Sequence, residues 1–84
     1  MREGYTVAEL QLPKGIVVGL RQTTRAVKEG RAREVFLACD ADPRLTEPLR
    51  ALCGTLPVRD EYTMVRLGRA AGVTVGTAAC AILI

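Results

Sequence analysis

The sequence predicts an α/β fold, a three-layer α/β/α sandwich with a four-stranded sheet. Strands and helices are expected in alternation, because short apolar or β-branched runs are separated by segments with helical periodicity. Glycine or proline stands at most of the boundaries, where such elements end. The length of 84 residues, 49% of them hydrophobic, suits one domain over residues 1–84 with one core.

The chain opens with a short predicted helix and a short predicted strand. Residues 6–9 have the spacing of a capping box, which favours a helix over about residues 6–12 that ends before Pro13. The β-branched run Ile16–Val18 lies between two glycines and predicts the first strand.

The stretch from Gly19 to Gly30 is expected to be a turn followed by a basic helix that starts at Leu20 or Arg21. Neither Gly19 nor Leu20 has a side chain that accepts a hydrogen bond, so the helix is predicted to be uncapped. Its free N–H groups and the positive end of its dipole favour an anion such as phosphate. Gly30 is expected to end the helix in a left-handed conformation.

One face of this helix is predicted to be cationic. At about 100° per residue, Arg21, Arg25 and Lys28 form a stripe, with Gln22 beside Arg25. A Gln amide both donates and accepts and can read base edges, where Arg and Lys mainly hold phosphates. An ordinary solvated basic face is the alternative. The side expected to face the protein holds Val27, with Leu20, Thr23 and Thr24 near it.

The middle of the chain predicts a central strand and a helix. Glu34–Cys39 is apolar after its first residue, as in a strand covered on both faces. Asp42 is expected to cap the next helix, with Pro43 in its first position. Because Pro48 would remove a helical hydrogen bond, an alternative has a turn first and Thr46 as the N-cap. The inner face of this helix is expected to hold Leu45, Leu49, Leu52 and Cys53, and Gly54 to end it.

The last third predicts an edge strand, a helix and a final strand. Leu56–Val58 contains a proline, which a central strand does not tolerate. Asp60 and Glu61 are expected to open the next helix, at the end its dipole prefers for carboxylates. The apolar residues 78–84 predict the last strand. If it lies beside the first strand, the loop Val73–Thr77 and the start of the basic helix share one end of the sheet. In the helix, Met64, Leu67 and Ala71 are expected to face inward, Arg66 and Arg69 outward, and Gly72 to follow its end.

The residue types argue against catalysis. The chain has no histidine, the commonest general base and metal ligand. Its three cysteines, Cys39, Cys53 and Cys80, are widely separated and are expected to be buried thiols in a reducing cytosol rather than a zinc site. Asp40 and Asp42 raise the alternative of acid/base or metal chemistry, but a helix cap is the simpler explanation. We therefore expect no catalytic residue, no metal and no cofactor.

Charge and the two ends of the chain narrow the class of partner. The net charge of +3 and pI of about 9.1 permit nucleic acid without requiring it. The N-terminus has no signal-peptide pattern, and the apolar C-terminal run is far shorter than the roughly 20 residues of a membrane helix. We expect a cytoplasmic protein with no membrane association. Positive charge is concentrated in one short segment whose only acidic residue is Glu29. Its basic residues are Arg21, Arg25, Lys28, Arg31 and Arg33.

The sequence resembles the small kink-turn RNA-binding proteins of the ribosomal L7Ae/L30e superfamily, and most of all its short bacterial members. The resemblance runs from Gly15 onward through GLRQTTRAVKEG, DADP, the pair Leu52-Cys53 and LGRAAGVTVGTAACAI, in that order. It implies a mixed sheet and a single non-enzymatic domain that binds a helix–bulge–helix RNA with tandem G·A pairs. It further implies rRNA or mRNA as the partner, association with the ribosome, and a monomer.

The resemblance also implies which residues bind RNA. In relatives the helix start enters the widened groove at the kink, so Arg21 and Gln22 would read or flank the G·A bases and Arg25 would contact the backbone. A second loop, Val73 to Val75, would pack around a flipped-out nucleotide. The alternative is that its two valines begin the last strand or fill the edge of the core. The expected RNA-binding residues are Gly19, Leu20, Arg21, Gln22, Thr24, Arg25, Lys28, Val73, Thr74 and Val75.

Two other classes of function stay open at this point. The same fold could serve as a protein-interaction module whose basic helix meets an acidic partner, without preference for kinked RNA. An enzyme that holds a nucleotide phosphate at the Gly19 turn is less well supported, because the chain has neither a P-loop nor a dinucleotide-binding glycine motif.

Overall fold

The computed structural model describes residues 15–84, and their elements follow the predicted alternation. In chain order they are β1 (Ile16–Val18), α2 (Leu20–Lys28), β2 (Ala32–Leu37), α3 (Pro43–Cys53), β3 (Val58–Arg59), α4 (Met64–Ala70) and β4 (Ala79–Leu83). The helix expected over residues 6–12 lies outside the described residues.

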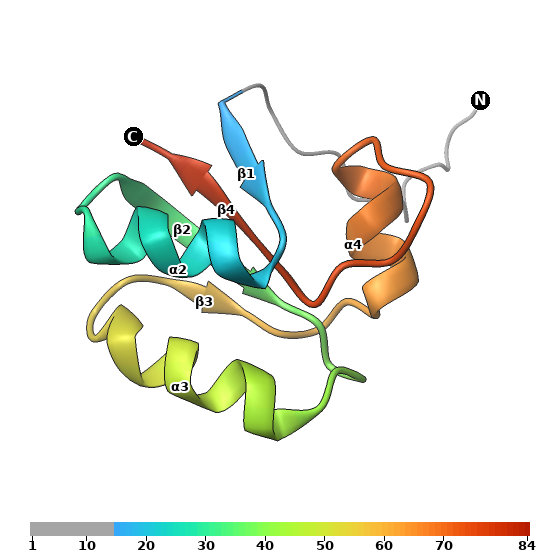
Figure 1. The fold of residues 1–84 in the computed structure, drawn as a ribbon, viewed down its shortest axis with the longest axis horizontal. Coiled ribbons are helices and arrows are strands. Elements are labelled where there is room, and N and C mark those ends of the chain that lie inside the picture. The colour runs from blue at the N-terminus through green and yellow to red at the C-terminus, as the bar shows by residue number, and fades with distance from the viewer. Residues whose placement is uncertain (1–14) are drawn as a thin grey trace.

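The strands form one mixed sheet in the order β1-β4-β2-β3. β4 pairs antiparallel with both of its neighbours, whereas β2 and β3 pair parallel. β3, which directly follows Pro57, lies at the edge of the sheet as predicted. Figure 1 shows α2 and α3 running beside each other along the sheet, with α4 apart from both.

The two central strands, β4 and β2, contribute side chains to two apolar layers, because neighbouring side chains on a strand point to opposite faces of the sheet. One layer, packed with α2 and α3, contains Val35, Leu37, Ala79 and Ala81 from the strands. The other, packed with Leu67 of α4, contains Phe36, Ala38, Cys80 and Ile82. Helices therefore cover both faces of the sheet, and the predicted three-layer sandwich is confirmed.

The pairing of the first and last strands sets one end of the sheet. Val18 lies opposite Cys80, and the next residue, Gly19, donates its N–H to the Ala79 carbonyl at 2.8 Å. The start of α2 and the end of the loop that leads into β4 are thus neighbours, as expected if the two strands were adjacent.

α3 starts at Pro43, so the alternative start at Thr46 is wrong. The Asp42 carboxylate accepts the Arg44 N–H at 2.9 Å and caps the helix, while Thr46 is buried inside it. The helix continues through Pro48, which lies on the exposed side, where water can replace the missing N–H donor. Leu49 and Cys53 face the core as predicted, but Leu45 and Leu52 are exposed.

α4 starts later than expected, at Met64, because its caps are not Asp60 and Glu61. The Thr63 hydroxyl accepts the Arg66 N–H at 3.2 Å, and the Asp40 carboxylate accepts the Met64 N–H at 2.8 Å. Asp40 and Asp42 therefore cap two different helices, which favours the structural interpretation of this pair over acid/base chemistry. Asp60 and Glu61, which were expected to open the helix, form exposed ion pairs instead, Asp60 with Arg50 and Glu61 with Arg59.

The prediction that all three cysteines are buried is wrong for Cys39. Cys53 and Cys80 are buried, but β2 ends at Leu37, and Cys39 lies exposed in the turn that follows. Burial raises the pKa of the Cys53 thiol, and it raises that of Cys80 to about 11.

Two further observations concern residues 15–84. None of their helices combines the length and the apolar character needed to cross a membrane. In the same part of the chain, no three His, Cys, Asp or Glu side chains are grouped so that they could hold a metal ion.

The thiols give a direct check of this packing. In the native protein at pH 8, Cys39 is expected to react with a thiol reagent at the rate of an exposed cysteine, while Cys53 and Cys80 react only in denaturant. The thiolate is the reactive species, and burial limits both access to it and its population. Cys39→Ser should remove the fast phase from the reagent's absorbance trace; fast labelling that survives this substitution would contradict the packing.

Candidate functional site

The start of α2 has the open, uncapped geometry that the sequence predicted. Gly19 is its N-cap residue, with φ 102° and ψ 151°, and no side chain among residues 15–84 caps the helix. The first helical hydrogen bond runs from the Thr23 N–H to the Gly19 carbonyl at 2.9 Å. The N–H groups of Leu20, Arg21 and Gln22 precede that bond and find no acceptor within residues 15–84.

The space in front of this turn is also open. The backbone of Gly19 lies in a region that side-chain-bearing residues almost never occupy. A Cβ built on Gly19 would meet no atom of residues 15–84 within 4 Å, so within this part of the chain the glycine is required by the backbone and not by a crowded neighbour. A ligand can therefore approach the free N–H groups closely.

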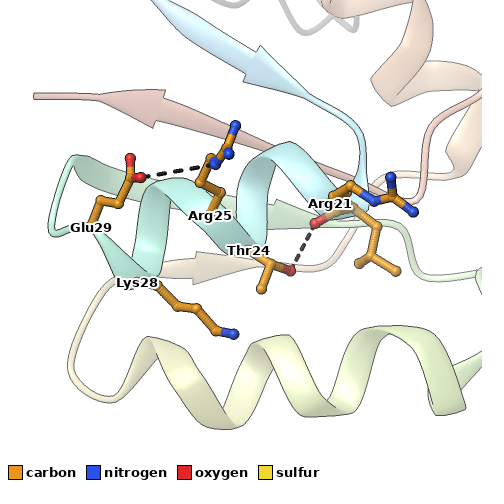
Figure 2. A pocket seen from close by; sticks show the side chains of 6 residues that line it. Arg21, Thr24, Arg25, Lys28 and Glu29 are labelled. Atoms are coloured by element: carbon orange, nitrogen blue, oxygen red, sulfur yellow. Dashed lines mark hydrogen bonds and ion pairs between the residues drawn. The ribbon is translucent and has the colours of Figure 1, made fainter.

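The exposed face of α2 forms a shallow groove that brings the predicted cations together (Figure 2). Arg21, Arg25 and Lys28 are all exposed there. In Figure 2, Lys28 extends on the side of the helix that faces α3, and Arg21 lies at the helix start. The residues that line the groove are Leu20, Arg21, Thr24, Arg25, Lys28 and Glu29.

Glu29 is a groove residue that was not expected at the site. Its carboxylate lies 3.9 Å from the Arg25 Nε and accepts a hydrogen bond from the Arg31 Nε at 2.8 Å. Two sequence signals pointed to it: Glu29 is the one acidic residue in the basic segment, and its spacing of four residues from Arg25 is typical of helix-surface ion pairs. Glu29 partly offsets the positive charge at the far end of the groove.

Thr24 and Leu20 line the groove but offer a ligand few unpaired polar groups. The Thr24 hydroxyl donates to the Leu20 carbonyl at 2.8 Å, so its hydrogen is used inside the helix. Leu20 also packs partly against the core. Gln22 is exposed in the first turn, next to Arg21, but it is not among the residues that line the groove.

The inner face of α2 differs in one respect from the prediction. Thr23 and Ala26 are its fully buried residues, while Val27, Leu20 and Thr24 are half-buried. Ala26 was missed because its small side chain gives a weak hydrophobic signal. The Thr23 hydroxyl has no hydrogen-bond partner within residues 15–84.

The second expected contact, the loop before β4, presents apolar side chains to solvent. Val73 is 37% exposed and Val75 is 71% exposed, and β4 begins only at Ala79. The valines therefore neither begin the strand nor fill the core.

This loop forms its own shallow hollow against α4, separate from the groove on α2. Sequence reasoning missed Val65 there, because a single apolar side chain on the outer face of α4 forms no pattern. It predicted that Arg69 faces outward but did not connect Arg69 with the loop. The hollow is lined by Val65, Arg69, Val73, Thr74, Val75 and Gly76.

Comparison with known proteins gives a consistent result. A model of the family described as "Ribosomal protein L7Ae/L30e/S12e/Gadd45" matches residues 5–84. RNA-binding protein GK0100 of Geobacillus kaustophilus (strain HTA426) is 46% identical over 70 residues, which are 81% of this chain and 85% of that protein. RNA-binding protein YbxF of Geobacillus stearothermophilus has the same identity and coverage.

Solved structures show the same fold. The 15.5kD RNA binding protein of Giardia lamblia superposes with a TM-score of 0.78 at 30% identity, over 84% of this chain and 62% of that one. A protein of unknown function from Bacillus halodurans superposes with a TM-score of 0.74 at 27% identity, over 82% of this chain and 71% of that one.

The conformation of Gly19 yields a stability prediction. Gly19→Ala should lower the free energy of unfolding by about 1–3 kcal/mol, because alanine is strained at a positive φ of this kind. Lys28→Ala, an exposed change in the same helix, should stay within about 0.5 kcal/mol of the parent. Urea denaturation followed by circular dichroism measures both; an unchanged midpoint for Gly19→Ala would show that the turn is not held in this conformation.

Proposed function

The chain belongs to the ribosomal protein L7Ae/L30e/S12e/Gadd45 family, and from that premise we propose that it binds RNA, in particular kink-turn RNA. Its relatives GK0100 and YbxF are named RNA-binding proteins, and so is the structural neighbour from Giardia lamblia. The proposed ligand is a helix–bulge–helix with tandem G·A pairs, bound without catalysis by a single domain over residues 1–84.

The observation that carries this proposal is the uncapped start of α2 beside a cationic groove. Three successive backbone N–H groups, the helix dipole and three exposed basic side chains all favour the same ligand, a phosphate backbone. An anion at this position satisfies donors that the fold leaves open.

The shape of the site favours a kinked RNA over a regular duplex. The major groove of an A-form helix is too deep and narrow for side chains to read. An α-helix is about 10–12 Å across with its side chains, so the start of α2 reaches base edges only where the groove is widened. A kink with sheared G·A pairs provides such a place.

We assign distinct roles to the residues of the site. Gln22, which does not line the cationic groove, reads or flanks the G·A bases together with Arg21. Arg25 and Lys28 hold the RNA backbone. Gly19 permits close approach, and Leu20 and Thr24 supply the apolar floor of the groove. The loop residues Val73, Thr74 and Val75 receive an unstacked nucleotide, for which exposed apolar side chains are a suitable surface.

The cellular setting is part of the proposal. The family description includes ribosomal proteins, which supports a ribosomal or ribosome-associated role with rRNA or mRNA as the partner. We propose that the protein acts in the cytoplasm as a monomer.

Binding to matched RNAs tests the proposed function. A kink-turn RNA should bind far more tightly than the same duplex with its G·A pairs replaced by Watson–Crick pairs, and fluorescent labels on its ends should report bending when protein is added. The logarithm of the affinity should fall with the logarithm of salt concentration, by up to roughly 0.9 for each phosphate contact if duplex DNA is the guide.

Equal, weak binding to both RNAs would reject kink-turn recognition and reduce the groove to a general electrostatic patch, which would favour an acidic protein partner. An affinity independent of salt would reject the proposed phosphate contacts.

Two substitutions separate the reading of bases from the holding of the backbone. Gln22→Ala should reduce the discrimination between kink-turn and straight RNA by about 1–3 kcal/mol, the value of one good base contact. Arg25→Ala should weaken both RNAs alike and reduce the salt slope by about one phosphate contact. Titration by fluorescence anisotropy measures both effects.

Arg33→Ala is the matched control, since it removes an exposed cation of β2 that does not line the groove. If Gln22→Ala and Arg25→Ala change the binding of the two RNAs in the same way, the assignment of roles is wrong.

A further inference from the structure

Gly68 of α4 is buried directly beneath the loop of residues 73–77. A Cβ built on it would lie 3.0 Å from the Val75 carbonyl carbon, closer still to the carbonyl oxygen, and 3.1 Å from the Gly76 Cα. All of these atoms belong to the backbone, which cannot rotate away as the end of a flexible side chain can. A side chain at Gly68 therefore forces the loop itself to move.

The backbone conformation does not explain this glycine. Gly68 lies within α4 and does not have the positive φ found at Gly19 and Gly72. In a helix interior, glycine is less favourable than alanine by about 1 kcal/mol. What the glycine provides is room for the loop.

The loop is attached to α4 at two levels, one helical turn apart. The Val73 N–H donates to the Gly68 carbonyl at 2.9 Å, and the Thr77 N–H donates to the Met64 carbonyl at 3.1 Å. Gly76 also fits closely, because a Cβ there would lie 3.2 Å from the Met64 backbone and Cβ. The backbone of the loop is thus docked while the side chains of Val73 and Val75 stay exposed.

We propose that Gly68 is a positioning residue for RNA binding, because its missing side chain lets the loop dock on α4 and fixes Val73 and Val75 as a preformed platform for an unstacked nucleotide. This inference rests on the proposed function. Gly68 does not contact the RNA itself; it sets the height of the platform above α4.

The test compares Gly68→Ala with the parent protein on two RNAs, a kink-turn and the same kink-turn with its unstacked loop nucleotide made abasic. On the complete RNA, Gly68→Ala should raise the Kd by about tenfold, the order of one lost base contact. On the abasic RNA the two proteins should bind equally. Val75→Ala, which shortens the platform without moving it, should show the same dependence on the RNA.

Each outcome decides between explanations. An equal loss of affinity by Gly68→Ala on both RNAs would mean a general structural role and would overturn the positioning role. If the parent protein already fails to distinguish kink-turn from straight RNA, the proposed function fails, and the inference with it.

A measurement on the parent protein keeps the inference testable even if Gly68→Ala does not fold. The Val73 and Thr77 amides, both hydrogen-bonded to α4, should be protected from hydrogen exchange before RNA is added. Exchange at the rate of an unstructured peptide in the free protein would rule out a preformed platform.

Discussion

The hydrogen bond from the Gly19 N–H to the Ala79 carbonyl, 2.8 Å long, joins the start of α2 to the start of the central strand β4. β4 pairs with both β1 and β2, so its position is fixed on two sides. The small side chains of Ala79 and Ala81 are fully buried in the layer under α2, which lets that helix lie close to the sheet. The direction in which the free N–H groups of α2 point is therefore set by the most constrained strand of the fold.

This arrangement divides α2 between stability and binding. Its inner face buries Thr23 and Ala26 completely, while its outer face keeps a cationic groove in water. The pair between Arg25 and Glu29 stabilises the protein only weakly, since the two side chains are 67% and 50% exposed and exposed pairs contribute about 0–1 kcal/mol. Arg25 can therefore exchange Glu29 for a phosphate at small cost.

The sequence was informative where the physics is local, and it misled where contacts are distant. The turn at Gly19, the cap at Asp42 and the alternation of strands all follow from neighbouring residues and were predicted correctly. At α4 the local cap at Thr63 was overlooked, and the cap from Asp40, 24 residues away from Met64, could not be seen in the chain. Asp60 and Glu61 therefore looked like the natural start. The hollow on α4 was found only in part, because Val65 joins it through the tertiary docking of the loop.

Gly19 and Gly68 act on the two proposed contact surfaces in opposite ways. At Gly19 no atom of the described residues would crowd a side chain and only the backbone angle demands glycine, so the residue opens the helix start to a ligand. At Gly68 the angle is ordinary and the neighbourhood is full, so the residue lets the loop come down onto α4. Both surfaces exist in the free protein, and preorganisation of this kind reduces the ordering cost of binding. RNA that already samples a bend would meet a protein that changes little, which places most of the conformational cost on the RNA.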